Sequence, residues 1–171
     1  MELVDLVDEN RCPLGRTAVR YGKKAPGELR SVVHICIFNS KGQLLIQRRV
    51  PEKKIWPGRW DVSAAGGVSA GETVRTSAER EVAEELGIRL DLTGLRPSLT
   101  VNFFGGFDDF YIVNRDIALD RLTLQKEEVS DARWVSIQEA QDMVDRGEFI
   151  PYPKSFLQFL YDMRHQFGFT G

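Results

Sequence analysis

The chain has 171 residues, of which 42% are hydrophobic and 28% are charged. These proportions exclude a disordered chain, and the length predicts a single domain over residues 1–171. The 23 lysines and arginines nearly balance the 25 acidic residues, which gives a net charge of −2. Without a general positive charge we expect neither a nucleic acid polymer nor a membrane surface as a partner. An anionic ligand would therefore be small and bound at a local site.

The N-terminal residues do not resemble a targeting segment. They are acidic and lack the basic start and apolar core of a signal peptide. No stretch approaches the roughly 20 apolar residues that cross a bilayer. Two cysteines, Cys12 and Cys36, are too few for a disulfide scaffold, and Cys36 lies in an apolar run where we expect it to be buried. These features predict a soluble, cytoplasmic protein.

The N-terminal part of the chain is predicted to form strands. Alternating apolar residues predict an edge hairpin over about residues 1–27, which ends in a loop that contains Gly and Pro. The β-branched run at 32–38 predicts a buried strand. A turn at 39–42 leads into a strand at 43–49, so that the two strands form a hairpin. His34, in the first of them, is expected to be a core residue.

A helix is predicted over residues 73–86. A glycine-rich turn at 64–71 precedes it and allows a ligand to approach the backbone closely. Gly87 ends the helix, as expected where the chain needs a left-handed residue after the last turn. The apolar stripe of this helix repeats every four residues, at Val74, Ala78, Val82 and Leu86.

The C-terminal half mixes strands and helices. Strands are predicted at 98–104 and 107–113, and helices near 137–146 and at about 154–167. Because strands and helices do not alternate regularly, we predict an α+β or mixed α/β fold. The apolar stripe of the last helix packs either on the sheet or on a second copy of the chain, so a homodimer is an open alternative.

Three carboxylates on the helix at 73–86 point to a metal site. Glu81, Glu84 and Glu85 are spaced i, i+3 and i+4, which places them on one face, opposite the apolar stripe. Three like charges this close repel one another unless a cation lies among them, and hard oxygen ligands suit Mg²⁺ or Mn²⁺. Carboxylates, a divalent cation and a glycine-rich backbone together predict a diphosphate site. The alternative is an ordinary solvated helix face.

The complete motif is more specific than the glutamates alone. Gly66 is followed after five residues by Glu72, and after seven more by the run Arg-Glu-Val-Ala-Glu-Glu-Leu-Gly-Ile at 80–88. Residues 66–88 resemble the Nudix box at every defined position. This resemblance implies a Nudix-type α/β/α sandwich with a mixed sheet. It also implies a hydrolase that uses divalent cations to cleave a diphosphate bond in nucleoside diphosphate derivatives or related organic diphosphates.

The resemblance implies roles for individual residues. Glu72 and Arg80 resemble the structural ion pair that ties the loop to the helix, so a substitution of Arg80 is expected to cost both stability and activity. The implied metal ligands are one backbone carbonyl and three carboxylates: Ala65, Glu81, Glu84 and Glu85.

The general base that activates water varies in position among proteins with this motif. Glu81 can serve from within the box, or a carboxylate from a later loop can. Glu127 and Glu128 are the later candidates, and we favour Glu128. An exposed acidic turn is the alternative interpretation of this pair.

Two segments outside the box narrow the choice among the branches of the Nudix superfamily. Residues 38–49 and 55–61 resemble the isopentenyl-diphosphate isomerase-like branch. The isomerases need a Cys where this chain has Ala65, and His residues where it has Gly67 and Arg30. Because isomerisation needs a proton donor on each side of the alkene, we predict hydrolysis instead. The alternatives are an isomerase-like enzyme and a module that binds a nucleotide or another diphosphate without turnover.

Substrate contacts are predicted on the strand at 43–49 and among the aromatic residues. Arg48 and Arg49 point to opposite faces of this strand, so at most one faces the site, where it would pair with phosphate oxygens. Trp56 is a candidate for stacking on a base. Four further aromatic residues are candidates for the same role: Trp60, Phe103, Phe104 and Phe107. Aromatic residues in such runs more often belong to a core, and this applies above all to Trp60.

Overall fold

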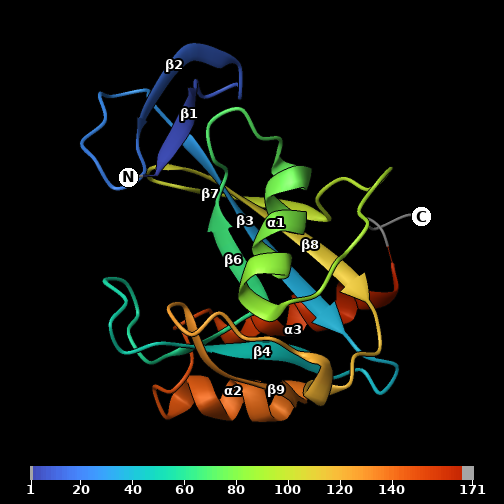
Figure 1. Ribbon diagram of the computed structural model, residues 1–171. Helices are drawn as coiled ribbons and strands as arrows, with labels where there is room; N and C mark the ends of the chain where they lie inside the picture. Colours follow the sequence, from blue (N-terminus) through green and yellow to red (C-terminus); the bar gives the residue numbers. More distant parts are fainter. Residues whose placement is uncertain (1, 167–171) are drawn as a thin grey trace.

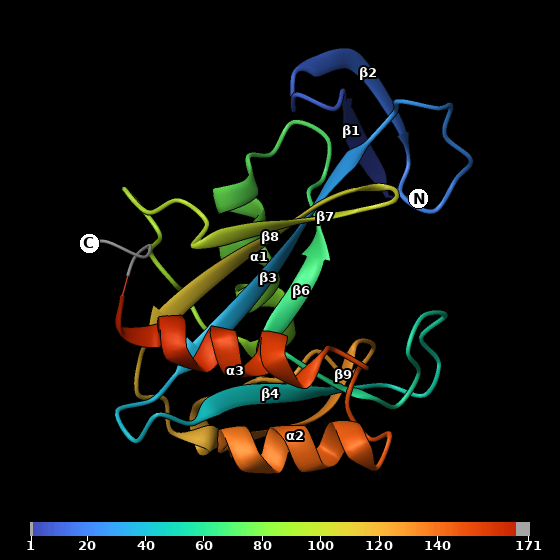
Figure 2. The same cartoon turned by 180° about the vertical axis from the view of Figure 1, so that it is seen from behind.

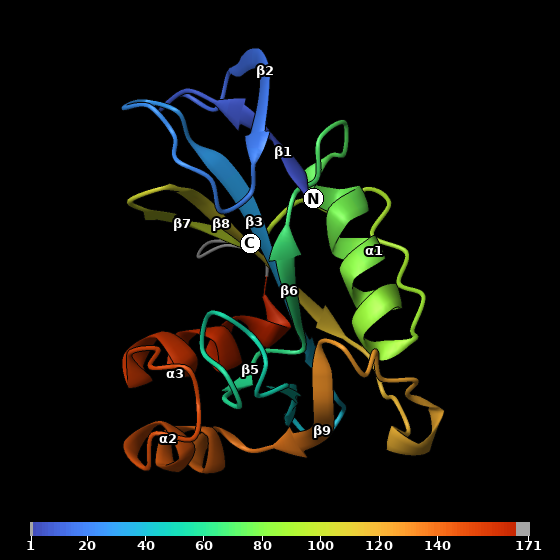
Figure 3. The same cartoon turned by 60° about the vertical axis from the view of Figure 1, so that its left-hand side comes forward.

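A computed structural model describes residues 2–166, which form helices around a mixed sheet (Figure 1). α1 (Val74–Leu86) covers one face of the sheet. α2 (Ile137–Asp145) and α3 (Lys154–Asp162) cover the other face, as the views in Figures 2 and 3 show. This arrangement confirms the predicted sandwich with a mixed sheet.

The sheet is organised around β3 (Arg30–Phe38). On one edge β8 (Gly106–Asn114) pairs with it in parallel along its whole length. On the other edge β6 (Ala64–Gly67) pairs with it antiparallel. The remaining strands of this sheet are β4 (Leu44–Arg49), β5 (Trp60–Asp61), β7 (Leu99–Phe103) and β9 (Val129–Val135).

One local expectation for this sheet is confirmed and one is wrong. The predicted hairpin of β3 and β4 is present but short, with its strands joined at Phe38 and Leu44, because β6 occupies most of that edge of β3. β4 also pairs with β9 along its whole length. The glycine-rich segment predicted as a turn at 64–71 begins with the strand β6. As a result, the backbone of β6 lies directly beside α1.

The side chains of β3 alternate between two cores. Val33, Ile35 and Ile37 pack with the apolar stripe of α1, whereas Cys36 and Phe38 pack with α2 and α3 on the opposite face. All five are fully buried. The buried residues of α3 belong to the same second core, so its apolar stripe packs on the sheet.

The helix ends follow local rules. The Thr73 hydroxyl caps the start of α1, and Gly87 ends it with a left-handed φ of 71°. α3 stops at Asp162 and continues only as the 3-10 turn Met163–His165, so the helix expected to reach residue 167 is shorter on the described part of the chain. Residue 167 itself lies outside the described residues. Within 2–166, no helix is both long and apolar enough to span a membrane.

The N-terminal residues form a separate two-stranded sheet beside the main one (Figure 1). It consists of β1 (Leu3–Val7) and β2 (Pro13–Val19), which pair antiparallel. Val4 is buried and forms a bridge to Ser69, just beyond β6. This contact keeps the end of the hairpin close to the glycine-rich segment. The residues that follow β2 therefore also lie near this segment.

Candidate active site

Two of the three predicted metal-binding glutamates on α1 are buried against β6. Glu81 is 7% exposed and Glu85 is 4% exposed, whereas Glu84 is exposed. A Cβ atom on Gly66 would lie 1.9 Å from Oε1 of Glu81, so the absence of a side chain in β6 makes room for this carboxylate. The expectation that all three carboxylates share a face away from the core is therefore wrong for Glu81 and Glu85. Packing of α1 on a strand of alanine and glycine residues explains the difference.

Burial perturbs both inward-facing carboxyls. The Oε2 atom of Glu85 accepts hydrogen bonds from Gln47 Nε2 at 2.8 Å and from the backbone N–H of Ala65 at 3.2 Å. Burial, followed by the charge of Glu81, raises the pKa of Glu85 to about 8. Burial also raises the pKa of Glu81, although Arg80 opposes this shift. Both carboxylates would gain stability from a bound cation.

Arg80 connects the loop before α1 to the glutamates. Its Nε donates to Glu72 at 2.9 Å, and its Nη1 donates to Glu81 at 2.9 Å and to Glu84 at 3.0 Å. Its Nη2 donates to the carbonyl oxygen of Gly67 at 3.2 Å. Although burial acts to raise it, the hydrogen bonds from Arg80 and Ser77 lower the pKa of the Glu72 carboxyl. The predicted ion pair of Glu72 and Arg80 is present, and Arg80 also orients two of the predicted metal ligands.

A cavity of about 510 Å³, the glutamate cavity, gathers these carboxylates. It also contains Glu128, which forms an ion pair with Lys53. Glu127 lies outside it, in an adjoining hollow. The members of the glutamate cavity named in the sequence predictions are Arg49, Ala65, Glu72, Arg80, Glu81, Glu84, Glu85 and Glu128.

The described residues hold no ready-made group of three acidic, His or Cys side chains around a single ion position. The hydrogen bonds explain this arrangement, because Arg80 engages Glu81 and Glu84 while Gln47 engages Glu85. Carboxylates that face a guanidinium must turn to face a cation. The donor set is nevertheless all oxygen, as Mg²⁺ and Mn²⁺ prefer.

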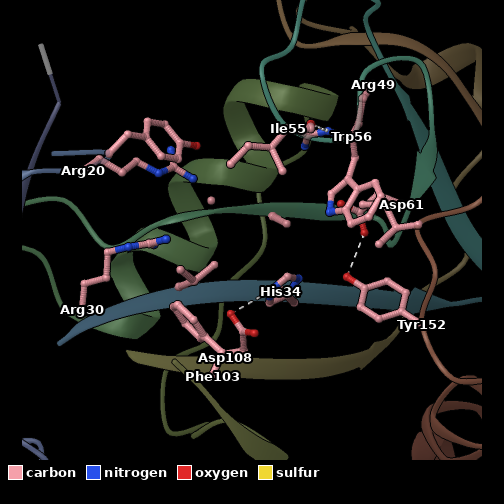
Figure 4. A pocket seen from close by; sticks show the side chains of 15 residues that line it. Arg20, Arg30, His34, Arg49, Ile55, Trp56, Asp61, Phe103, Asp108 and Tyr152 are labelled. Atoms are coloured by element: carbon pink, nitrogen blue, oxygen red, sulfur yellow. Dashed lines mark hydrogen bonds and ion pairs between the residues drawn. The ribbon is translucent and has the colours of Figure 1, made fainter. Parts of the chain in front are cut away.

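A second cavity of about 350 Å³, the arginine–aromatic cavity, adjoins the first (Figure 4). In Figure 4 Arg20 and Arg30 lie at one end, and Trp56 and Tyr152 lie at the other. The residues shared by the two cavities are Arg20, Tyr21, Arg49 and Ala65. A ligand can therefore contact the glutamates and the second cavity at the same time.

The predicted substrate residues separate in the structure. Arg49 lines both cavities, and its Nε donates to the carbonyl oxygen of Ile55 at 3.1 Å. Arg48 is exposed, lines neither cavity and donates to the carbonyl oxygen of Gly58. Alternation along β4 thus selects Arg49 alone, and Arg48 is not brought to the site. Trp56 is 44% exposed and lines the arginine–aromatic cavity.

The other aromatic candidates divide between core and surface. Trp60 and Phe107 are buried, at 8% and 6% exposure, as expected for core residues. Phe104 is fully exposed at the turn between β7 and β8. Phe103 is the one of these four that lines the arginine–aromatic cavity.

His34 is not the core residue that its strand position predicted. It lines the arginine–aromatic cavity, where its ring stacks on Phe110 at 4.5 Å and its Nε2 lies 3.2 Å from the carboxylate of Asp108. His34 shares a face of β3 with Cys36 and Phe38, but it lies nearer the start of the strand, where this face borders the cavity. A strand pattern assigns a face and does not show where the core ends.

Several residues of the site carry no local sequence signal. Arg20, Lys53, Asp108 and Tyr152 come from four separate segments and meet only in the folded chain. For Arg30 the sequence offers only its correspondence to a His of the isomerases. The close approach of β2, β3 and β8 brings the arginines and Asp108 together, and these pairings depend on contacts between distant residues.

Comparisons with known proteins agree with this geometry. The sequence model of the NUDIX domain matches residues 28–154. An uncharacterised Nudix hydrolase of Listeria monocytogenes is 52% identical over 165 residues, which cover 96% of each chain. An isopentenyl-diphosphate Delta-isomerase of Brevibacterium linens is 31% identical over 155 residues, 85% of this chain and 82% of the isomerase.

A solved structure shares the fold over nearly the whole chain. The crystal structure of a Deinococcus radiodurans protein superposes with a TM-score of 0.73 and 27% identity, and it covers 94% of this chain and 99% of its own. Together with the glutamates on α1, these similarities show that the chain belongs to the Nudix hydrolase family, enzymes that act on phosphoric anhydride bonds.

Proposed function

We propose that this protein is a Mg²⁺- or Mn²⁺-dependent hydrolase that cleaves the diphosphate bond of a nucleoside diphosphate derivative or a related small organic diphosphate. The observation that carries the proposal is the glutamate cavity, where Glu81 and Glu85 are buried beside Glu84 and Glu128. Buried carboxylates are costly unless a cation compensates their charge. The cations would compensate the negative charge of the glutamates, and the diphosphate would compensate the positive charge of the cations.

The predicted ligands fit a divalent cation by chemistry and by burial. Glu81, Glu84 and Glu85 would hold it, together with the carbonyl oxygen of Ala65, which lines the same cavity. When bound, the cation would neutralise charge on the phosphoryl group and lower the pKa of a water molecule. Arg80 positions Glu81 and Glu84 for this role.

Glu128 is the general base that this arrangement favours, with Glu81 as the alternative within the box. Glu128 lies across the glutamate cavity from α1, on the loop before β9, and its ion pair with Lys53 holds its carboxylate there. In this role Glu128 accepts a proton from the water that attacks phosphorus. Lys53 then also places a positive charge beside the reacting phosphoryl group.

Two other functions from the sequence predict different outcomes. An isomerase needs a proton donor where the chain has the methyl group of Ala65, so the cavity favours hydrolysis. A non-catalytic binding module would hold a diphosphate without releasing product. A cytoplasmic location and a homodimer stay predictions.

The test is cleavage of a panel of nucleoside diphosphates, nucleotide sugars, dinucleotides and isopentenyl diphosphate, with Mg²⁺, Mn²⁺ or EDTA. We expect metal-dependent release of phosphate or nucleotide from at least one substrate. Glu85→Gln keeps the size of the side chain and removes its charge, so we expect turnover to fall by about 10³-fold. Glu79→Gln, on the same helix but outside the cavity, is the matched control and should keep the wild-type rate.

Glu128→Gln tests the assignment of the general base, and Glu127→Gln, at the neighbouring residue, is its control. We expect about a 10²- to 10⁴-fold loss of kcat for the first variant and no loss for the second. Near wild-type turnover by Glu85→Gln would contradict the metal assignment. Tight binding of a panel member without cleavage would favour the binding module, and conversion of isopentenyl diphosphate without phosphate release would favour the isomerase.

A further inference from the structure

Two guanidinium groups at one end of the arginine–aromatic cavity are incompletely partnered. Arg20 follows β2 and Arg30 begins β3, and both line this cavity. The Nε of Arg20 and the Nη1 of Arg30 are shielded from solvent, and neither has a hydrogen-bond partner within the part of the chain that the structure describes. A buried donor without a partner is costly, so such groups often indicate a ligand.

Aromatic rings hold both guanidinium groups in place. The Arg20 guanidinium lies 5.1 Å from the ring centre of Tyr21, and the Arg30 guanidinium lies 5.3 Å from that of Phe103. Nη1 of Arg20 also donates to both carboxylate oxygens of Glu2, at 3.1 and 2.9 Å. Fixed guanidinium groups bind an oxyanion with little further ordering.

The charges of the two arginines act on each other. Burial, followed by the charge of Arg20, lowers the pKa of Arg30. The charge of Asp108 acts in the opposite direction but is the smaller effect. An anion between the two guanidinium groups would relieve this repulsion.

The arginines lie close to the glutamate cavity. A Cβ on Gly67 would lie 2.9 Å from Nε of Arg20, just as a Cβ on the preceding Gly66 would meet the Glu81 carboxylate. Consecutive residues of a strand face opposite sides, so Arg20 and Glu81 approach β6 from its two faces. Arg20 lines both cavities.

We propose that Arg20 and Arg30 form a second phosphoryl-binding subsite, so that the N-terminal hairpin completes the substrate site. One phosphoryl group of a diphosphate lies at the glutamates, and the other lies between the two arginines. The inference rests on the proposed function, since it assumes a diphosphate ligand. Arg20 lies outside residues 28–154, which match the family's domain. In this arrangement Arg20 reaches the substrate from the part of the chain that precedes the matched residues.

The test compares two unreactive probes that differ in the number of phosphoryl groups. Methylenediphosphonate has two, and methylphosphonate has one. Calorimetric titration of the full chain in Mg²⁺ should show that the wild type binds the first probe about ten-fold or more tightly than the second. Arg30→Met and Arg20→Met should each weaken the binding of methylenediphosphonate by about 10- to 100-fold. The affinity for methylphosphonate should change by less than about two-fold in both variants.

Two variants serve as controls. Arg16→Met removes an exposed arginine of β2 that pairs with Glu28, away from both cavities, and should bind both probes like the wild type. Arg30→Lys keeps the charge and should recover part of the affinity that Arg30→Met loses. Thermal unfolding of each variant shows whether it has folded. Arg30→Met leaves the hairpin contacts of Arg20 and Glu2 intact.

Three results would overturn the subsite. The first is equal affinity of the wild type for the two probes. The second is unchanged binding of methylenediphosphonate by both Met variants. The third is an equal loss of affinity for both probes in those variants. The probes are not hydrolysed, so these outcomes do not depend on turnover. A chain that binds through its arginines but cleaves nothing would retain the subsite and lose the proposed hydrolysis.

Discussion

The two adjoining cavities are built in different ways. The glutamate cavity takes half of its charged residues, including three of its glutamates on α1, from one helix and the loop before it, within the segment 66–88. The arginine–aromatic cavity draws its residues from at least five segments between Arg20 and Tyr152. The first can be recognised from spacing along the chain, whereas the second exists only once distant strands have paired. Chemistry that is confined to one helix is therefore easier to infer from a sequence than the contacts that select a substrate.

The contact between Gly66 and Glu81 is the strongest test of how the glutamate cavity is built. A methyl group at this position overlaps the carboxylate, so Gly66→Ala should displace Glu81. We expect turnover to fall about 100-fold, as for a misplacement of about 1 Å. The measurement is kcat/KM on the best substrate of the panel, with thermal unfolding as the check on folding.

The double variant Gly66→Ala/Glu81→Gln separates displacement from a general disturbance of β6. If Gly66→Ala acts through Glu81, the double variant should be no slower than Glu81→Gln alone. Fully additive losses would show that the glycine has another role.

Arg80 joins the loop and the helix of the glutamate cavity, so it should affect stability and activity together. Arg80→Gln removes ion pairs to Glu72, Glu81 and Glu84, and we expect unfolding free energy to fall by about 2 kcal/mol. Urea unfolding and kcat measure the two effects. Arg75→Gln is the matched control, since its ion pair with Glu79 is long, at 4.0 Å, and should contribute less than about 0.5 kcal/mol.

The buried Glu85 makes the metal-free protein sensitive to pH. Burial, followed by the charge of Glu81, raises the pKa of Glu85 from its ordinary value of 4.5 to about 8, so the folded state binds this proton more tightly than the unfolded state. Its contribution to stability is present below pH 4.5 and is lost as the pH rises towards 8. The slope is at most about 1.4 kcal/mol per pH unit.

Urea unfolding in EDTA between pH 5 and 8 measures this slope. Glu85→Gln should flatten it, and Glu79→Gln should leave it unchanged. Mg²⁺ should stabilise the wild type more at pH 8 than at pH 6, because its ligands must be deprotonated. Parallel pH profiles for wild type and Glu85→Gln would contradict the assignment of this proton.

Substitution of Trp56 tests the arginine–aromatic cavity, and its expected effect is the smallest of these predictions. If its exposed ring stacks on the organic part of the substrate, Trp56→Ala should raise KM about ten-fold, with kcat changed less than about two-fold. Trp56→Phe should recover part of this loss. Phe104→Ala, at an exposed turn outside both cavities, should leave KM unchanged.

Local rules explain how much of this molecule was predictable. The limits of α1 follow from Thr73 and Gly87, and the box residues identify the family, because each depends on neighbours along the chain. The parallel pairing of β3 with β8 joins residues such as Arg30 and Gly106, and no local pattern specifies that partner. For the same reason the subsite arginines and the exposure of His34 to a cavity were missed.

Burial of Glu81 and Glu85 was missed for a different reason. Helical spacing gives the angle between side chains, but it does not show how wide a face the rest of the fold covers. Gly66 of β6 lies against the Glu81 carboxylate, and Gln47 and the backbone of Ala65 contact that of Glu85, so the covered face extends to both carboxylates. A glycine-rich segment predicts a turn, and such a pattern gives no sign that the segment packs on a helix as a strand.

The two cysteines make the protein its own reporter of unfolding. Cys12 is exposed on the N-terminal hairpin, whereas Cys36 is fully buried in the central strand β3. Burial also raises the pKa of the Cys36 thiol, so a thiolate-specific reagent reaches it only when the sheet opens. Cys12 reacts in every molecule and serves as the reference, whereas labelling of Cys36 records how often the middle of the sheet separates. Mass spectrometry after timed labelling therefore measures how readily this sheet opens, with no residue introduced into the chain.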